Sequence, residues 1–180
     1  RHNRLNAAAA IAAAIVLGAP HEAVGRALAA YRTLPHRLAL VARIADVAFY
    51  DDSKATNVGA AVAAIDSLAE PRVVLIAGGK GKDGSYEPLA RVLRQRGRAA
   101  VLIGEAAPRL ADALAGSVEL HRASTLDAAV ALARDLAAAG DAVLLAPACA
   151  SFDMFSSYAE RGRRFVQAVE RLAASEASPR

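Results

Sequence analysis

Three short polar segments of the sequence contain residue types that bind anionic small molecules. Residues 51–57 read DDSKATN, residues 78–85 read GGKGKDGS and residues 146–157 read APACASFDMFSS. Their lysines can neutralise negative charge, their hydroxyls can donate hydrogen bonds, and their glycines let the backbone approach a ligand closely. We predict that these segments form one small-molecule site.

The first segment has two interpretations, which the sequence alone leaves open. Lys54 and Thr56 would add a charge and a hydroxyl to the backbone amides at a helix start, which attract anions. Alternatively, Thr56 or Asn57 only caps the helix and Asp52 pairs with Lys54.

The other two segments also have structural alternatives. The glycine-rich segment matches neither GxxxxGK[ST] nor GxGxxG, so its spacing does not indicate a nucleotide-binding loop, and a solvated loop is the alternative. Cys149 has apolar neighbours and no histidine placed as a base, which favours a buried, inert thiol. Ser151 lacks the GxSxG context of a hydrolase, and we interpret it as a hydrogen-bond donor.

The chain around these segments alternates short β-type runs with amphipathic stretches, as is typical of βα units around a mostly parallel sheet. Ligands of such sheets bind beyond the carboxyl ends of the strands, and each polar segment follows a predicted strand. We predict strands over residues 38–44, 47–50, 73–77, 99–103, 118–121 and 142–145. We predict helices over residues 58–68, 86–94, 106–114, 125–138 and 158–172.

Two further helices are predicted before this domain, over residues 6–17 and 21–31. The Leu34-Pro35 step then breaks the helical pattern, because the residue before a proline avoids the helical region. We therefore place a domain boundary between residues 1–35 and residues 36–180.

Composition excludes several classes of protein. The net charge of +4 is mild for 180 residues, and arginines scattered without aromatic partners argue against nucleic-acid binding. The single cysteine excludes an internal disulfide, and no metal-ligand spacing is visible. The longest apolar run, residues 7–20, is shorter than the roughly 20 residues of a membrane span. We expect a cytoplasmic monomer without a membrane segment.

Five strings, in this order and covering nearly the whole chain, resemble the Mur ligase family. They are RHNRLNAAAA, LPHR, DDSKATN, GGKGKDGSY and PACASFDMFSSYAERG, and the third and fifth are similar to the branch that adds D-glutamate to UDP-N-acetylmuramoyl-L-alanine in peptidoglycan synthesis. The resemblance implies an α/β, Rossmann-like domain over residues 36–180, preceded by the last helices of a central ATPase domain.

The resemblance also implies partners and site residues. The N-terminal domain and most of the central domain, with the phosphate loop and the Mg²⁺ ligands, would lie outside these 180 residues, so we expect no catalytic residue here and no activity of the chain alone. The residues expected to contact ATP are Asn3, Asn6, Arg37 and Asp52. Those expected to bind the α-carboxylate of D-glutamate are Thr56 and Lys82. Those expected to bind its side-chain carboxylate, partly through backbone N–H groups, are Ser151, Phe152 and Tyr158.

Lys54 lies between these two groups of binding residues and, with Lys82, would position the amino acid. Lys80 departs from the family pattern, and we expect it to face solvent. The alternative functions are another Mur ligase, a ligase similar to folylpolyglutamate synthase, or a binding module of dinucleotide fold without catalytic activity.

Overall fold

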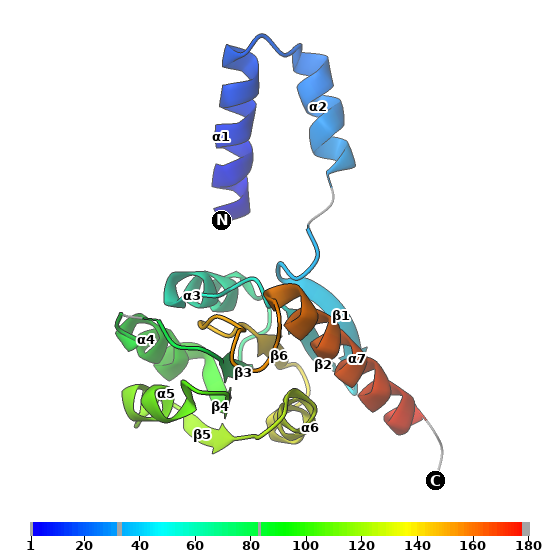
Figure 1. The fold of residues 1–180 in the computed structure, drawn as a ribbon. Helices are drawn as coiled ribbons and strands as arrows, with labels where there is room; N and C mark the ends of the chain where they lie inside the picture. Colours follow the sequence, from blue (N-terminus) through cyan, green and yellow to red (C-terminus); the bar gives the residue numbers. More distant parts are fainter. Residues whose placement is uncertain (1, 32–33, 83, 178–180) are drawn as a thin grey trace. The chain divides into compact units, whose positions relative to one another are not determined.

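The chain is described by a computed structural model that covers residues 2–31, 34–82 and 84–177. It divides into two compact units, Arg1–Leu34 and Pro35–Arg180, which are described separately (Figure 1). The division falls one residue from the boundary predicted at Pro35.

The first unit is a pair of helices, α1 (His2–Val16) and α2 (His21–Ala30). Gly18, with a φ of +86°, allows the turn after α1, in which the Ala19 amide donates to the Ala14 carbonyl at 2.9 Å. α2 contains no buried residue, and the side chains of Leu28 and Tyr31 are 45% and 64% exposed. Among the residues of this pair whose burial is described, 6–31 and 34, none is buried, so these residues form no core of their own. Both predicted helices are confirmed, although α1 begins earlier, at His2.

The second unit is built on one six-stranded sheet in the order β1-β2-β6-β3-β4-β5. β1 pairs with β2 in the antiparallel direction, and all other neighbours are parallel. The strands are β1 (Ala39–Ile44), β2 (Val47–Asp51), β3 (Val73–Gly78), β4 (Gly97–Ile103), β5 (Glu119–Arg122) and β6 (Ala142–Leu145). The predicted fold class is thus confirmed.

Helices cover both faces of this sheet (Figure 1). One face packs against α3 (Val58–Ser67), α4 (Glu87–Arg96) and α5 (Ala107–Leu114), and the other against α6 (Leu126–Leu136) and α7 (Tyr158–Ala177). Successive side chains of a strand point to opposite faces, so Leu75 packs in the first layer while Val74 and Ile76 pack in the second. Burial on both faces explains why β3 reads as an uninterrupted apolar run.

All predicted strands and helices of this unit are present, with shifts at their ends. α7 continues to Ala177 instead of Leu172, because the alanine-rich residues after Leu172 favour the helix. β4 begins two residues early, at Gly97, where the Arg98 guanidinium forms an ion pair with the buried Asp141 carboxylate of the neighbouring turn.

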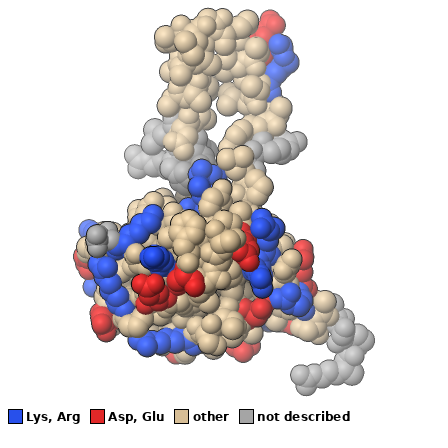
Figure 2. Space-filling view, in the orientation of Figure 1, with Lys and Arg blue, Asp and Glu red and all other residues tan. Residues whose placement is uncertain are grey.

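Charged side chains of both signs are interspersed on the visible face of the sheet-containing unit (Figure 2). That face carries no single basic stripe of the kind that binds nucleic acid. None of the described helices is long and apolar enough to cross a membrane.

Gly78 ends β3 with a φ of +126°, and a Cβ atom there would collide with the Ile103 carbonyl of β4. We expect Gly78→Ala to lower the free energy of unfolding by at least about 2 kcal/mol, because alanine can neither adopt this conformation nor fit this space. Gly59→Ala, at the second residue of α3, is the control. A Cβ atom there would lie 3.6 Å from the nearest atom, so this variant should not lower the free energy of unfolding. Urea denaturation followed by circular dichroism measures both, and equal midpoints for Gly78→Ala and the unmodified chain would contradict the expectation.

Candidate functional site

The three polar segments meet at one edge of the sheet. Residues 51–57 (loop A), 78–85 (loop B) and 146–157 (loop C) follow β2, β3 and β6. β6 lies between β2 and β3, and all three run in the same direction. Their carboxyl ends therefore lie side by side, as predicted.

Backbone hydrogen bonds join the loops into one unit with loop C in the middle. The Ala148 amide donates to the Ala55 carbonyl of loop A at 2.9 Å. On the other side, Lys80 and Ala150 exchange two backbone hydrogen bonds of 2.9 and 3.0 Å between loops B and C. A shift of one loop is thus transmitted to the other two.

Small residues make this close approach possible. Gly79 has a φ of +127°, and a Cβ atom there would collide with the Ala150 carbonyl. Ala148 adopts the left-handed conformation with a φ of 56°, which costs an L-residue roughly 1–2 kcal/mol. The glycines and alanines of the site therefore serve loop-to-loop packing.

Arg161 of α7 lies beneath the loops, and its guanidinium is fully buried. Nε and Nη2 donate to the hydroxyl and the carbonyl of Ser53, both at 3.0 Å. Nη1 and Nη2 donate to the Cys149 carbonyl at 3.3 and 3.2 Å. Nη1 also contacts the carbonyls of Ala150 at 3.3 Å and Gly78 at 3.4 Å. One side chain thus bonds to all three loops.

Burial lowers the pKa of Arg161 to about 10, which leaves the guanidinium charged at neutral pH. The sequence analysis does not single out Arg161 within the predicted helix over residues 158–172. The helical period could have indicated that Arg161 is buried, since Phe165 and Val169, four and eight residues later, are buried on the same face of α7.

Lys54 extends from loop A to the start of α7. Its ammonium lies 4.0 Å from the centroid of the Tyr158 ring, a favourable contact between a cation and an aromatic face. The Ser53 hydroxyl donates to the Tyr158 carbonyl at 2.8 Å, next to this contact. Lys54 and Tyr158 are therefore two predicted site residues that the structure brings together.

Thr56 is half-buried and precedes α3, whose N-cap is Asn57. The Asn57 side chain accepts a hydrogen bond from the Ala60 amide at 2.9 Å. The capping interpretation of loop A is therefore confirmed for Asn57. A role for Thr56 in binding stays a prediction.

Ser151 and Phe152 lie at the turn of loop C. Ser151 is buried, and its carbonyl accepts hydrogen bonds from Phe155 at 2.8 Å and Met154 at 3.2 Å, whereas the Phe152 side chain is 71% exposed. Tyr158 is the first residue of α7, where backbone amides have no partner within the helix. This arrangement suits a carboxylate that binds backbone N–H groups.

Lys82 is exposed, and the backbone around it is held by α5. Arg109 donates to the carbonyls of Lys82 and Gly84 at 3.2 and 2.9 Å, and its guanidinium lies 5.5 Å from the centroid of the Tyr86 ring. Lys80 is also exposed, as expected. Loop B thus carries two lysine side chains on a backbone that neighbouring elements hold in place.

Arg37 and Asp52 lie near the start of the second unit. The Asp52 carboxylate accepts a hydrogen bond from the Leu38 amide at 3.1 Å. His36 contacts the buried Asp51 carboxylate at 2.6 Å and packs against Gly162, where a Cβ atom would collide with the imidazole ring. These contacts fix the backbone on both sides of the exposed Arg37.

The other two residues predicted at ATP belong to the first unit. Asn6 is exposed on α1, and the side chain of Asn3 lies outside the described residues. Their proximity to Arg37 and Asp52 stays a prediction.

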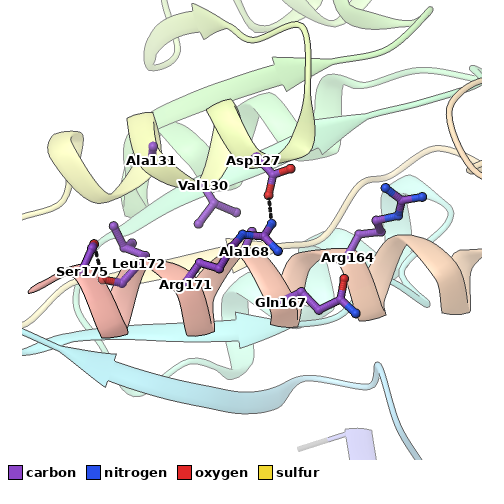
Figure 3. A pocket seen from close by; sticks show the side chains of 9 residues that line it. All are labelled: Asp127, Val130, Ala131, Arg164, Gln167, Ala168, Arg171, Leu172 and Ser175. Carbon is purple, nitrogen blue, oxygen red and sulfur yellow. Dashed lines mark hydrogen bonds and ion pairs between the residues drawn. The ribbon is translucent and has the colours of Figure 1, made fainter. Parts of the chain in front are cut away.

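A groove of about 540 Å³ between α6 and α7 contains none of the predicted site residues (Figure 3). Asp127 and Arg171 form an ion pair across it. The candidate site therefore remains the loop edge of the sheet. The described residues contain no group of three His, Cys, Asp or Glu side chains that could hold a metal ion.

The fold is that of an α/β domain of the dinucleotide-binding type, with a candidate small-molecule site at the carboxyl edge of its sheet. Residues 36–149 match the family model described as "Mur ligase, glutamate ligase domain". The chain belongs to the Mur ligase family.

Two curated relatives are named UDP-N-acetylmuramoylalanine--D-glutamate ligase. The protein from Nitrosospira multiformis is 51% identical over 98% of this chain and 37% of its own length. The protein from Ralstonia nicotianae is 54% identical over 96% of this chain and 35% of its own length. The chain thus spans little more than a third of the length of these relatives.

Solved structures agree in fold. The UDP-N-acetylmuramate-alanine ligase MurC from Thermotoga maritima matches 97% of this chain and 38% of its own with a TM-score of 0.68 and 20% identity. MurF from the same organism, in complex with ADP, matches 96% of this chain and 39% of its own with a TM-score of 0.66 and 18% identity.

Cys149 is fully buried, with the Tyr86 hydroxyl 3.5 Å from its sulfur, and burial raises the pKa of the thiol. We expect iodoacetamide to label the native chain on the order of 100-fold more slowly than the chain unfolded in urea, because the reactive thiolate is both scarce and inaccessible. Mass spectrometry over time measures the rates at this single cysteine. Equally fast labelling of both states would indicate an accessible thiolate and a reactive cysteine.

Proposed function

We propose that this chain is the amino-acid-binding, C-terminal part of an ATP-dependent ligase that joins D-glutamate to UDP-N-acetylmuramoyl-L-alanine in peptidoglycan synthesis. Relatives that carry this activity in their names are about half identical to almost the whole chain. The observation that carries the proposal is the hydrogen-bonded unit of loops A, B and C, in which lysines, hydroxyls and helix-start amides gather at one sheet edge.

D-glutamate has two carboxylates, which need two separate groups of donors. In this proposal, Thr56 and Lys82 of loops A and B bind the α-carboxylate. Ser151, with the backbone amides of Phe152 and Tyr158, binds the side-chain carboxylate from loop C and the start of α7. Charged donors suit this task, since their hydrogen bonds to carboxylates are roughly twice as strong as neutral ones.

The chemical step would follow from this placement. A carboxylate oxygen of UDP-N-acetylmuramoyl-L-alanine attacks the γ-phosphorus of ATP and ADP leaves, which gives an acyl phosphate. The neutral D-glutamate amine then attacks the acyl carbon, inorganic phosphate leaves, and the nitrogen loses a proton to give the amide. The residues of this chain hold the amine in position for attack. Such positioning can contribute about 7–11 kcal/mol to catalysis at best.

The first unit supports an assignment of residues 1–35 to the end of a central ATP-binding domain. Its two helices line an apolar hollow that includes Ile11, Val24 and Leu28, yet α2 buries no residue. Such a surface requires a partner, which the remaining part of a central domain would supply. Asn3, Asn6, Arg37 and Asp52 would contact ATP. No Mg²⁺ ligand is assigned to this chain, and we propose a cytoplasmic, monomeric enzyme.

An amino-acid panel tests the proposal directly. The full-length protein is incubated with ATP, Mg²⁺ and UDP-N-acetylmuramoyl-L-alanine, and phosphate release is measured with D-glutamate, L-glutamate, L-lysine or meso-diaminopimelate. D-glutamate alone should support turnover. Turnover with a diamino acid, or with L-glutamate in a parallel reaction where a folate replaces UDP-N-acetylmuramoyl-L-alanine, would instead assign the chain to one of the alternative ligases.

Lys82→Ala in the full-length protein should raise the KM for D-glutamate about 10- to 100-fold, because a charge-assisted hydrogen bond of about 1.5–3 kcal/mol is lost. The KM for ATP should stay within about twofold, since ATP contacts other residues in this proposal. Lys80→Ala is the matched control on the same loop, where the side chain is exposed and the backbone pairs with Ala150. Unchanged D-glutamate kinetics in Lys82→Ala would remove Lys82 from the site.

A further inference from the structure

The buried guanidinium of Arg161 connects the two halves of the proposed amino-acid site. We propose that Arg161 is a positioning residue that sets the separation between these halves and thereby the length of the dicarboxylic amino acid that the site accepts. The inference rests on the proposed function, because it assumes a ligand with two carboxylates.

The bonds of Arg161 end next to the proposed ligand-binding residues. On loop A, the hydroxyl and carbonyl of Ser53 both accept hydrogen bonds at 3.0 Å, and Lys54 is the next residue. On loop C, the Cys149 and Ala150 carbonyls accept bonds at 3.2–3.3 Å, and Ser151 follows directly. A displacement at either end of the guanidinium therefore moves a residue that would contact the amino acid, either Lys54 or Ser151.

The Ser53 hydroxyl extends this connection to α7. It accepts a hydrogen bond from Arg161 Nε at 3.0 Å and donates one to the Tyr158 carbonyl at 2.8 Å. Lys54 lies over the Tyr158 ring, so the same pair of bonds also supports the contact between loop A and the helix start. Ser53 is itself fully buried, which leaves it little freedom to move.

The shape of the arginine side chain is what this role needs. A guanidinium is planar and has five N–H donors in a fixed arrangement, so it can bond to several loops at defined distances. A lysine ammonium keeps the charge but is a single point on a flexible stem. Loop B also encloses the guanidinium, because a Cβ atom on Gly79 would lie 3.1 Å from Nη1.

Other bonds keep the loops together when Arg161 is replaced. The backbone hydrogen bonds from Ala148 to Ala55 and between Lys80 and Ala150 do not involve Arg161. We therefore expect Arg161→Lys to fold and to retain the loops, with a less strictly fixed separation between loops A and C.

The test compares D-glutamate with D-aspartate, which is shorter by one methylene group. For the full-length ligase, the KM of D-glutamate and the inhibition constant of D-aspartate against it are measured, and their ratio reports discrimination by length. Arg161→Lys should reduce this discrimination at least tenfold. A role in folding alone would lower the amount of active enzyme without changing the ratio.

Two further variants complete the experiment. Arg164→Lys is the control on the same helix, because Arg164 is exposed and pairs with Glu160 at 3.3 Å, and its discrimination should equal that of the unmodified enzyme. Ser53→Ala removes the bonds to Arg161 Nε and to Tyr158 while leaving the arginine in place. It should reduce discrimination at least threefold, and it decides the question if Arg161→Lys does not fold.

The outcomes separate the inference from the proposed function. Failure of the unmodified enzyme to use D-glutamate would overturn the proposed function, and the inference with it. Use of D-glutamate with unchanged discrimination in Arg161→Lys, or in Ser53→Ala where Arg161→Lys does not fold, would overturn the inference alone.

Discussion

The loop edge of the sheet depends on a charge buried beneath it. The guanidinium of Arg161 bonds to one hydroxyl and to carbonyls of three loops that lie far apart in the sequence. Burying an ionised group is costly unless its donors are paired, and here backbone oxygens provide the partners. The reverse also holds, since each buried carbonyl left without a donor would cost about 1–3 kcal/mol. The arginine and the loops therefore each need the other for full stability, although backbone bonds between the loops remain without the guanidinium.

This mutual requirement explains the residue types around the guanidinium. The carbonyls converge on one point because Gly78 and Gly79 have positive φ values and Ala148 has a left-handed conformation. Larger side chains would separate the loops, since a Cβ atom on Gly79 would collide with the Ala150 carbonyl. The lysines and hydroxyls of the proposed site are thus carried on a backbone whose geometry small residues permit and one arginine stabilises.

Much of this architecture could be predicted from the sequence, because its signals are local. Apolar runs such as Val73–Gly78 and the polar segments after them predicted the strands and a site at their carboxyl ends. Arg161 was missed because its role depends on contacts with residues distant in the sequence, such as Ser53 and Gly78, which are 108 and 83 residues away. The same holds for His36, whose contacts with Asp51 and Gly162 arise only when three separate elements pack together.

The two units differ in what they need from the rest of a protein. The sheet-containing unit buries two hydrophobic layers and holds loops A, B and C in place with its own side chains. Among the residues of the helical unit whose burial the structure describes, none is buried, and its two helices line an apolar hollow. In the proposed function, the amino-acid half of the site is held within this unit, whereas the nucleotide half depends on other parts of the protein, so the two substrates would meet only when the domains come together. The need for the domains to come together fits the proposed ligase, in which domain closure would bring the reacting atoms into line.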